Sequence, residues 1–332
     1  MTSLTGKLPL VAIGRGLLGL LLAMLFAAPW IFDPAELQIL TELLCLLVLA
    51  VMWNLLAGYA DIVTIGQHGF VGIGCYAFYG FVVLAGVDPY LAIPLAGLTS
   101  LAFAIPSMVV VFRLRAAYLA VGTWVLAEVM MLGAGKINAF GAGLGVSLPV
   151  SVVRAFGGNI VERFTTIYWM SLALALVAMG ATYALMRSST GIGLTAMRDD
   201  EEAAGTVGVN LFRARVACFL WAAPFLGLAG ALITLQKLRV APAASFSIID
   251  WTVYIIFIVI IGGVGSFEGP IIGTLVFFLI REYLQGWGVW HFIVLGAVSI
   301  AMVLIEPRGI WGLLRRIVPG DLIPVSHKPP RR

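Results

Sequence analysis

Residues 187–215 read RSSTGIGLTAMRDDEEAAGTVGVNLFRAR and form the one long polar stretch of this 332-residue chain. Residues 165–186 (TTIYWMSLALALVAMGATYALM) precede it, residues 215–236 follow it, and both flanking runs are strongly apolar. Each flanking run is long enough to cross a bilayer as a helix, which takes about 20 mostly apolar residues. A polar loop held between two such runs predicts a chain that crosses a membrane at least twice.

The composition extends this prediction to the whole chain. Hydrophobic residues make up 61% and charged residues 11% of the sequence, and the mean hydropathy is +1.07. Soluble domains contain about 25% charged residues, so a soluble fold could not bury this much apolar surface. The apolar runs are nearly continuous and lack the alternation of a transmembrane barrel, which predicts an all-α polytopic membrane protein.

About ten membrane-spanning helices are expected from the lengths of the apolar runs. The first follows Lys7 and Arg15 as a signal peptide would, but in a polytopic chain we expect it to remain as the first span. The third, eighth and ninth are short or interrupted by glycine, which predicts broken or re-entrant segments. The ten candidates are residues 16–32, 36–57, 68–86, 90–112, 116–135, 165–186, 215–236, 251–264, 270–286 and 289–306.

The distribution of Lys and Arg predicts the orientation of the chain. Ten spans with an inside N-terminus leave fourteen Lys and Arg residues in inner segments and five in outer ones, with Arg281 unassigned. Because cytoplasmic loops carry the excess of these residues, both termini and the 187–215 loop are predicted to be cytoplasmic. Residues 1–318 then form one transmembrane domain that contains this loop, and residues 136–164 lie outside. Residues 319–332, rich in Pro and Arg, are expected to form a disordered cytoplasmic tail.

Glycines gather in two clusters, GQHGFVGIG at residues 66–74 and GGVGSFEGPIIG at residues 262–273. Close helix packing is the ordinary role of a single glycine in a membrane. Dense clusters, one of which contains Pro270, favour broken segments instead, and these are tolerated inside protein or beside a water-filled path. Interrupted segments in the two halves of a chain often flank a transport path, so both clusters are predicted to lie near one.

Ionisable side chains inside the spans are further candidates for such a path. A charge at mid-membrane costs at least about 2.5 kcal/mol, so Glu128, well within the fifth span, is expected to face water or protein. A hydrogen bond that holds two helices together is an equally acceptable role for Glu128, and a packed neutral histidine is the ordinary interpretation of His68. The candidates for the path are Asp61, Thr64, Gly66, His68, Glu128, Gly262, Gly263 and Gly265.

Catalytic and metal-binding patterns do not stand out. The three histidines, His68, His291 and His327, are scattered, and no nucleophile–base pair or metal-ligand spacing suggests itself. Three cysteines, an odd number, lie in or beside apolar runs and are expected to be small core residues without a disulfide framework. We therefore expect neither an enzyme nor a bound cofactor.

Within the polar loop, residues 198–208 predict a short helix followed by a sharp turn. Acidic residues favour the positive end of the helix dipole, and RDDEEAA places four of them before two alanines, which are strong helix formers. Gly208 can adopt the left-handed conformation that ends a helix. A solvated connecting loop is the alternative to a docking helix for a soluble motor. The chain has no G-x-x-x-x-G-K-[ST] phosphate loop, so ATP-driven transport would need a separate nucleotide-binding subunit.

Four blocks of sequence resemble the inner-membrane permeases of branched-chain amino-acid ABC importers, specifically the M-type subunit of the high-affinity Liv system. The third block is the most specific, because it joins the Arg-Asp-Asp-Glu run to the EAA-x-x-x-G signature of ABC permeases. The blocks are NLLAGYADIVTIGQHGFVGIGCY (54–76), RLRAAYLAVGTWVLAE (113–128), STGIGLTAMRDDEEAAGTVGVN (189–210) with FLGLAGAL (225–232), and IGGVGSFEGPIIGT (261–274) with EPRGIWGLL (306–314).

The resemblance implies one permease subunit that moves branched-chain or related amino acids across the bacterial inner membrane by alternating access. It also implies a homologous second permease, two cytosolic ATP-binding subunits and a periplasmic substrate-binding protein as partners. Residues 136–164 and 237–250 would be docking surfaces for the binding protein. The residues implied to couple the cytoplasmic loop to the ATPase are Arg198, Asp199, Asp200, Glu201, Glu202, Ala203, Ala204 and Gly208.

Four positions depart from the family pattern. Asp61 and Ala116 stand where the family usually has glycine, Thr64 replaces a serine, and His68 replaces a small residue. Three of them lie in the first glycine-rich block, beside the expected path, so the solute stays open: another amino acid, an amide, urea or an aromatic acid. A stand-alone secondary transporter that uses Glu128 as a proton carrier is the alternative of a different class.

Overall fold

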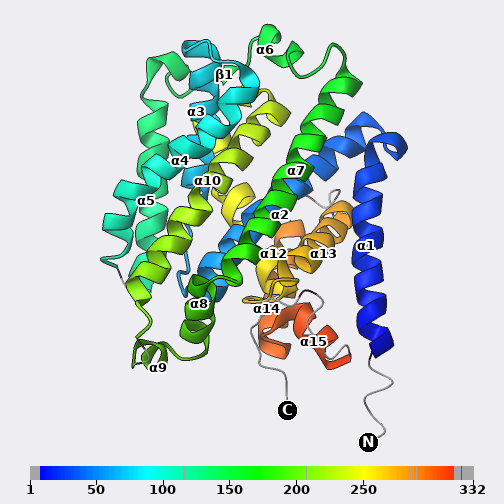
Figure 1. Ribbon diagram of the computed structural model, residues 1–332. Helices are drawn as coiled ribbons and strands as arrows, with labels where there is room; N and C mark the ends of the chain where they lie inside the picture. Colours follow the sequence, from blue (N-terminus) through cyan, green and yellow to red (C-terminus); the bar gives the residue numbers. More distant parts are fainter. Residues whose placement is uncertain are drawn as a thin grey trace, which may run out of the picture.

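The structure of the protein is a computed structural model, shown in Figure 1. It describes residues 8–114, 117–206, 208–284, 286, 288, 290–317 and 323, and of these it leaves the side chains of residues 8–10, 199, 201 and 291 undescribed. The predicted tail, residues 319–332, lies outside the described residues except for Ile323. The described part is built of helices joined by short turns and one two-stranded sheet, as the predicted all-α membrane class requires.

Eight helical segments of the described chain are long and apolar enough to cross a membrane, and a bent pair brings the number to nine. The bent pair turns by 45° between residues 305 and 309. All ten predicted runs overlap a helix, but α13 has only 16 residues and falls short of a span by itself. The spans are formed by α1 (Leu8–Ile31), α2 (Pro34–Asn54) with η1 (Leu55–Tyr59), α3 (Gln67–Tyr79) with η2 (Gly80–Leu84), α4 (Pro89–Val111), α5 (Ala117–Gly135), α7 (Ile160–Met186), α10 (Leu211–Lys237), and α11 (Pro242–Ser245) with η4 (Ile249–Val253) and α12 (Tyr254–Gly262). The bent pair consists of α14 (Trp290–Ile305) and α15 (Gly309–Ile317), and α13 (Gly269–Leu284) lies between α12 and α14 in the chain.

Local sequence signals set where several of these helices begin. Asp88 accepts hydrogen bonds from the amides of Tyr90 (2.9 Å) and Leu91 (3.4 Å) at the start of α4. Asn159 and Asn210 accept the equivalent bonds at the starts of α7 and α10, at 2.8 and 2.9 Å. Asp and Asn are favoured at this position because their side chains satisfy amides that have no partner within the helix.

The centre of the bundle is formed by α2, α3 and α10. In the most apolar 18-residue stretch of each span, 78% of the residues are buried for α2 with η1, 72% for α3 with η2 and 67% for α10, against 6% for α1. In Figure 1, α1 accordingly stands at the edge of the bundle. Glycine lets α3 and α10 approach closely, because a Cβ atom at Gly74 would collide with the backbone carbonyl of Gly227.

The connecting segments gather at two opposite ends of the bundle (Figure 1). At one end, β1 (Val146–Ser147) pairs antiparallel with β2 (Arg239–Val240), close to η3 (Asn138–Phe140) and α6 (Val150–Arg154) in the chain. At the other end lie α8 (Ser189–Asp199), α9 (Glu201–Thr206) and α15. The loops that the charge count assigned to different sides of the membrane are therefore separated in space, and the two expected outer loops are joined by the β1–β2 pair.

The second glycine cluster is broken, as predicted, but the first cluster beyond Gly66 lies within the continuous helix α3, and the irregular segment lies just before it. Residues 60–66 run without helix between η1 and α3, and Gly263 and Gly265 interrupt the path from α12 to α13 with φ angles of 128° and 72°. Residues that carry a Cβ atom rarely adopt such φ angles, whereas glycine does so without steric penalty. These two breaks bring irregular backbone into the interior of the bundle.

Candidate functional site

The polar loop folds into two short helices, α8 and α9, with a defined end. The carboxylate of Asp200 accepts a hydrogen bond from the amide of Ala203 (3.0 Å), which caps α9. Gly208 follows with a φ of 92°, in the left-handed region that its sequence position predicts. The amide of Val209 then donates to the carbonyl of Ala204 (3.1 Å), the bond that typically closes such a helix end. The segment is therefore a folded pair of short helices with a capped start and a closed end to α9.

One face of this element is open and the other is packed. Glu202 and Ala203 are exposed, whereas Ala204 is only 3% exposed and belongs to the core. Asp200, Arg198 and Gly208 are exposed as well. The side chains of Asp199 and Glu201, two of the predicted coupling residues, lie outside the described residues. The exposed face at Glu202 and Ala203 is the part of the loop available to a partner.

Arg198 connects this element to the second glycine cluster. Its guanidinium Nη1 donates to the carbonyl oxygen of Gly265 at 3.0 Å, and its Cζ lies 5.6 Å from the ring centroid of Tyr59. Gly265 belongs to a tight turn, residues 263–268, between α12 and α13, and Tyr59 ends the π turn that continues α2. Arg198 thus spans from α8 to both the 263–268 turn and the end of α2.

Asn54 holds the same turn from the other side. Its Oδ1 accepts from the amide of Gly265 and its Nδ2 donates to the carbonyl of Ser266, both at 2.8 Å. The packing leaves no room for a side chain at Gly58, where a Cβ would lie 2.7 Å from Cα of Gly265. A Cβ at Gly262 would collide with the carbonyl of Gly269. Of the predicted path residues, Gly265 therefore contacts the 187–215 loop, and Gly262 and Gly263 lie next to it in the chain.

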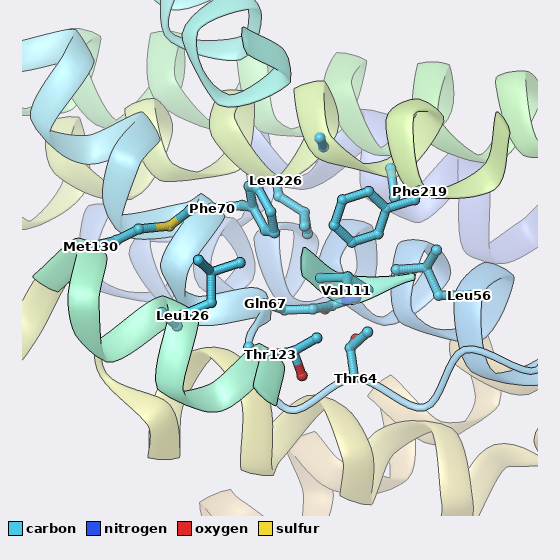
Figure 2. Close-up of a pocket in the computed structure, with 14 residues that line it drawn as sticks. Leu56, Thr64, Gln67, Phe70, Val111, Thr123, Leu126, Met130, Phe219 and Leu226 are labelled. Atoms are coloured by element: carbon cyan, nitrogen blue, oxygen red, sulfur yellow. The ribbon is translucent and has the colours of Figure 1, made fainter. Parts of the chain in front are cut away.

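The first glycine cluster lines a central pocket with about 400 Å³ of empty space (Figure 2). The pocket lies between the 60–66 segment, α3, α5 and α10, with one residue each from η1 and α4. Its wall is mostly apolar, which is typical of small-molecule sites. The described residues that line it are Leu56, Thr64, Gly66, Gln67, Phe70, Val111, Thr123, Leu126, Ala127, Met130, Phe219, Ala222, Ala223 and Leu226.

Thr64 and Gln67 are the notable polar groups of this pocket. Each is 2% exposed, and the Thr64 hydroxyl and both amide atoms of Gln67 lack a hydrogen-bond partner among the described residues. The Thr123 hydroxyl differs: it donates to the carbonyl of Ala120 (2.8 Å) and accepts from the amide of Ile65 (3.2 Å). In Figure 2, Thr64, Thr123 and Gln67 lie on one side of the pocket, across from Phe70 and Phe219.

The geometry explains why Gly66 is present and adds Gln67 to the candidates. A Cβ at Gly66 would collide with the carbonyl of Thr123, so glycine allows α5 to approach the start of α3. The sequence patterns of charged side chains and glycine clusters do not point to Gln67, because it is neither charged nor a glycine. The signal that could have found it is one side-chain amide placed between Gly66 and His68 in a broken, apolar segment.

The three ionisable candidates lie at different places. His68 is fully buried, and its Nδ1 lies 3.1 Å from both the carbonyl of Ile65 and the hydroxyl of Thr252, so it joins α3 to η4. Asp61 is largely exposed in an open cleft of about 1600 Å³, where its carboxylate lies 3.8 Å from Arg215. Glu128 is half-buried on α5, accepts from the indole of Trp124 at 3.1 Å, and is not part of the central pocket's lining.

Comparisons with known proteins agree on one family. The permease LivM of the high-affinity branched-chain amino acid transport system of Salmonella typhimurium is 26% identical over 317 residues, covering 89% of this chain and 74% of the relative. LivM of Escherichia coli K12 is 25% identical over the same shares. A probable branched-chain amino acid transport permease, LivH of Methanocaldococcus jannaschii, is 22% identical over 278 residues, or 76% of this chain and 85% of the relative.

No solved structure matches this chain significantly. Residues 36–303 match the family described as the permease component of branched-chain amino acid transport systems. The matched region runs from α2 into α14 and contains the central pocket, the 263–268 turn and the α8–α9 element. The chain is therefore a multi-pass membrane protein that belongs to the family of branched-chain amino acid transport system permease components.

Proposed function

We propose that this chain is one permease subunit of an ATP-binding-cassette importer that carries branched-chain or related amino acids across the bacterial inner membrane. The family match over residues 36–303 supports the transport role. The observation that carries the mechanism is the capped α8–α9 element, which has an exposed acidic face and is tied by Arg198 to the interior turn at Gly265. Such an element suits a subunit that receives force from outside the membrane.

The motor in this proposal is a pair of cytosolic ATP-binding subunits, because the chain itself carries no phosphate-loop motif. The subunit is then no enzyme: ATP hydrolysis belongs to the partner chains. Residues 1–318 form the transmembrane domain, with both termini and the 187–215 loop on the cytoplasmic side. The excess of Lys and Arg at that end supports this orientation.

The coupling residues are Arg198, Asp199, Asp200, Glu201, Glu202, Ala203, Ala204 and Gly208. Movement of α9 would pass through α8 to Arg198, and from there to Gly265 and the end of α2. The hydrogen bonds of Asn54 to the same turn make these parts one mechanical unit. A push on the loop would therefore tilt α2 and α12 together, the rigid-body motion that alternating access requires.

A second permease subunit is expected against α5. Only 17% of the α5 residues are buried, yet this helix carries the half-buried carboxylate of Glu128 and the exposed indole of Trp124. A carboxylate that faces lipid is costly, whereas one that faces a neighbouring protein can be hydrogen-bonded. The position of Glu128 supports a permease interface, and it does not favour a stand-alone proton-coupled transporter, which would need this carboxylate in the solute path.

The periplasmic binding protein would dock at the opposite end of the bundle. The β1–β2 pair joins the two loops assigned to this role, residues 136–164 and 237–250, into one surface. Leu144, between η3 and β1, is 82% exposed there and offers an apolar contact.

A charge reversal at Glu202 tests the docking role of α9. Glu202→Arg should abolish co-purification of the ATP-binding subunits in mild detergent and stop ATP-driven uptake in proteoliposomes. Asn138→Arg adds the same side chain at an exposed site of the opposite end and should retain the ATP-binding subunits. Unchanged uptake and unchanged ATP hydrolysis in Glu202→Arg would refute the docking assignment.

A further inference from the structure

We propose that the central pocket is the site where the transported solute contacts this subunit, with Gln67 and Thr64 binding its polar head group. This inference rests on the proposed transport function and adds the place in the subunit where the solute binds and the side chains that bind it. The ligand is a small solute that has an apolar body and no net charge, such as a zwitterionic amino acid with an apolar side chain. Three features of the pocket carry this assignment.

The first feature is the unpartnered polar atoms. Gln67 presents one donor group and one acceptor, and Thr64 presents a hydroxyl that can act as either; both side chains are 98% or more buried and none of these atoms has a partner among the described residues. Native proteins rarely leave buried polar atoms unsatisfied. A ligand with both an acceptor and a donor, as in a carboxylate next to an ammonium group, would satisfy them.

The second feature is the start of α3. This 13-residue helix begins at Gln67, and its N-cap, Gly66, has no side chain to cap it. The amide of His68 donates to the hydroxyl of Thr252 at 3.3 Å, so the amide of Gln67 is the one assigned to a ligand. Helix N-termini attract carboxylates, because the first amides lack helical partners and the helix dipole is positive there. Gly66 and Gln67 both line the pocket, so the solute carboxylate is assigned to this end, next to Nε2 of Gln67. Half-helices whose N-termini face an anionic solute group recur in transporters.

The third feature is the wall opposite the polar atoms. The rings of Phe70 and Phe219 pack edge to face, with their centroids 5.6 Å apart, and Leu226 lies beside them. Leu126 and Met130 extend the apolar surface along α5. None of the fourteen described lining residues is ionisable, so a lysine-like or glutamate-like side chain would lose its hydration without gaining a counter-charge.

The pocket is closed in this conformation. Only about 10 Å³ of it admits the centre of a water molecule, roughly the space that one water needs. The open cleft at Asp61 and Arg215 lies next to the pocket, because residues adjacent in the chain line the two spaces. Val63 and Phe112 border the cleft, and Thr64 and Val111 border the pocket. Movement of these two short segments would open the pocket toward the side of the cytoplasmic loop.

The test uses the complete importer, the permease pair with its ATP-binding subunits and binding protein, in proteoliposomes with radiolabelled L-leucine. Gln67→Leu and Thr64→Val keep side-chain volume but remove the polar atoms. Each should reduce leucine uptake at least tenfold, while ATP hydrolysis stimulated by the binding protein stays within twofold of the unaltered complex. The matched controls Gln236→Leu and Thr182→Val change buried side chains outside the pocket and should transport leucine normally.

A second readout keeps the inference falsifiable if a variant folds poorly. Met130→Ala enlarges the apolar side of the pocket and should raise the ratio of phenylalanine uptake to leucine uptake, which general destabilisation would not do. Normal leucine uptake by Gln67→Leu and Thr64→Val, with an unchanged ratio in Met130→Ala, would overturn the pocket assignment alone. Absence of ATP-driven amino-acid uptake in the unaltered complex would instead overturn the proposed function.

Discussion

The guanidinium of Arg198 donates a hydrogen bond to the carbonyl oxygen of Gly265 at 3.0 Å, so the 187–215 loop touches the broken segment between α12 and α13. The sequence predicts different roles for these two residues: coupling for Arg198 and a place near the solute path for Gly265. Their contact joins the 263–268 turn to the 187–215 loop. Neither residue lines the central pocket around Thr64 and Gln67, where we propose that the solute binds.

Removal of the Arg198 side chain should uncouple ATP hydrolysis from uptake. In Arg198→Ala the loop loses a charge-assisted hydrogen bond, and a loss of about 1.4 kcal/mol corresponds to about a tenfold change in an equilibrium. We expect uptake per ATP hydrolysed to fall about tenfold in proteoliposomes. Arg213→Ala, at an exposed arginine of the same loop, is the control and should keep the ratio. An unchanged ratio of uptake to ATP hydrolysis in Arg198→Ala would show that this contact does not couple the two processes.

Asn54→Ala should destabilise the protein. The asparagine is 3% exposed and satisfies two backbone groups of the 263–268 turn. Each group left unsatisfied costs about 1–3 kcal/mol, so the midpoint of thermal unfolding in detergent should drop clearly. Asn138→Ala changes an exposed asparagine and should leave the midpoint where it is. Equal midpoints for the two variants would contradict a structural role of Asn54.

Gly74→Ala and Gly133→Ala should change stability in opposite directions. A Cβ at Gly74 collides with the carbonyl of Gly227, whereas one at Gly133 on α5 meets nothing within 4 Å. Overpacking costs about 1–3 kcal/mol, while alanine for glycine in an open helical site gains about 0.5–1 kcal/mol. Thermal unfolding of both variants measures the difference. Similar midpoints would mean that α3 and α10 do not pack as described.

The orientation can be measured by cysteine labelling of whole cells. The native cysteines, Cys45, Cys75 and Cys218, are at most 1% exposed, so an impermeant maleimide should react only with an introduced thiol. Leu144→Cys should react in intact cells, and Thr206→Cys on α9 only after the inner membrane is opened. The reverse result would invert the orientation that the positive charges predict.

The ion pair between Glu42 on α2 and Arg281 on α13 should stabilise the bundle. Two guanidinium nitrogens of Arg281 lie 3.1 and 3.4 Å from the two carboxylate oxygens, and both side chains are about three-quarters buried. Loss of either partner should cost about 1.5–3 kcal/mol. A double-mutant cycle of Glu42→Gln and Arg281→Gln, followed by unfolding in detergent, should give a coupling energy above 0.5 kcal/mol. Strict additivity would mean that the pair contributes nothing.

Features that depend on neighbouring residues in the chain were predictable. The length of each apolar run predicts a helix, and the expected break at the second glycine cluster is present, whereas the first cluster forms the continuous helix α3. The left-handed turn at Gly208 follows from its position after a short acidic helix. Each of these properties is decided within a few residues, because helix formation, capping and turns are local.

The sequence by itself therefore determined the membrane class, the helical architecture and the family. Only the tertiary structure decided which predicted site residues meet. Gly265 joins Arg198 across 67 positions of the chain, and Asn54 reaches Ser266 across 212. The burial of Gln67 next to α5 and α10 is equally invisible in a local pattern. Contacts at such separations depend on how the helices pack, and that packing is set by close-fitting surfaces, such as the glycine approach of α3 to α10, that no single segment contains.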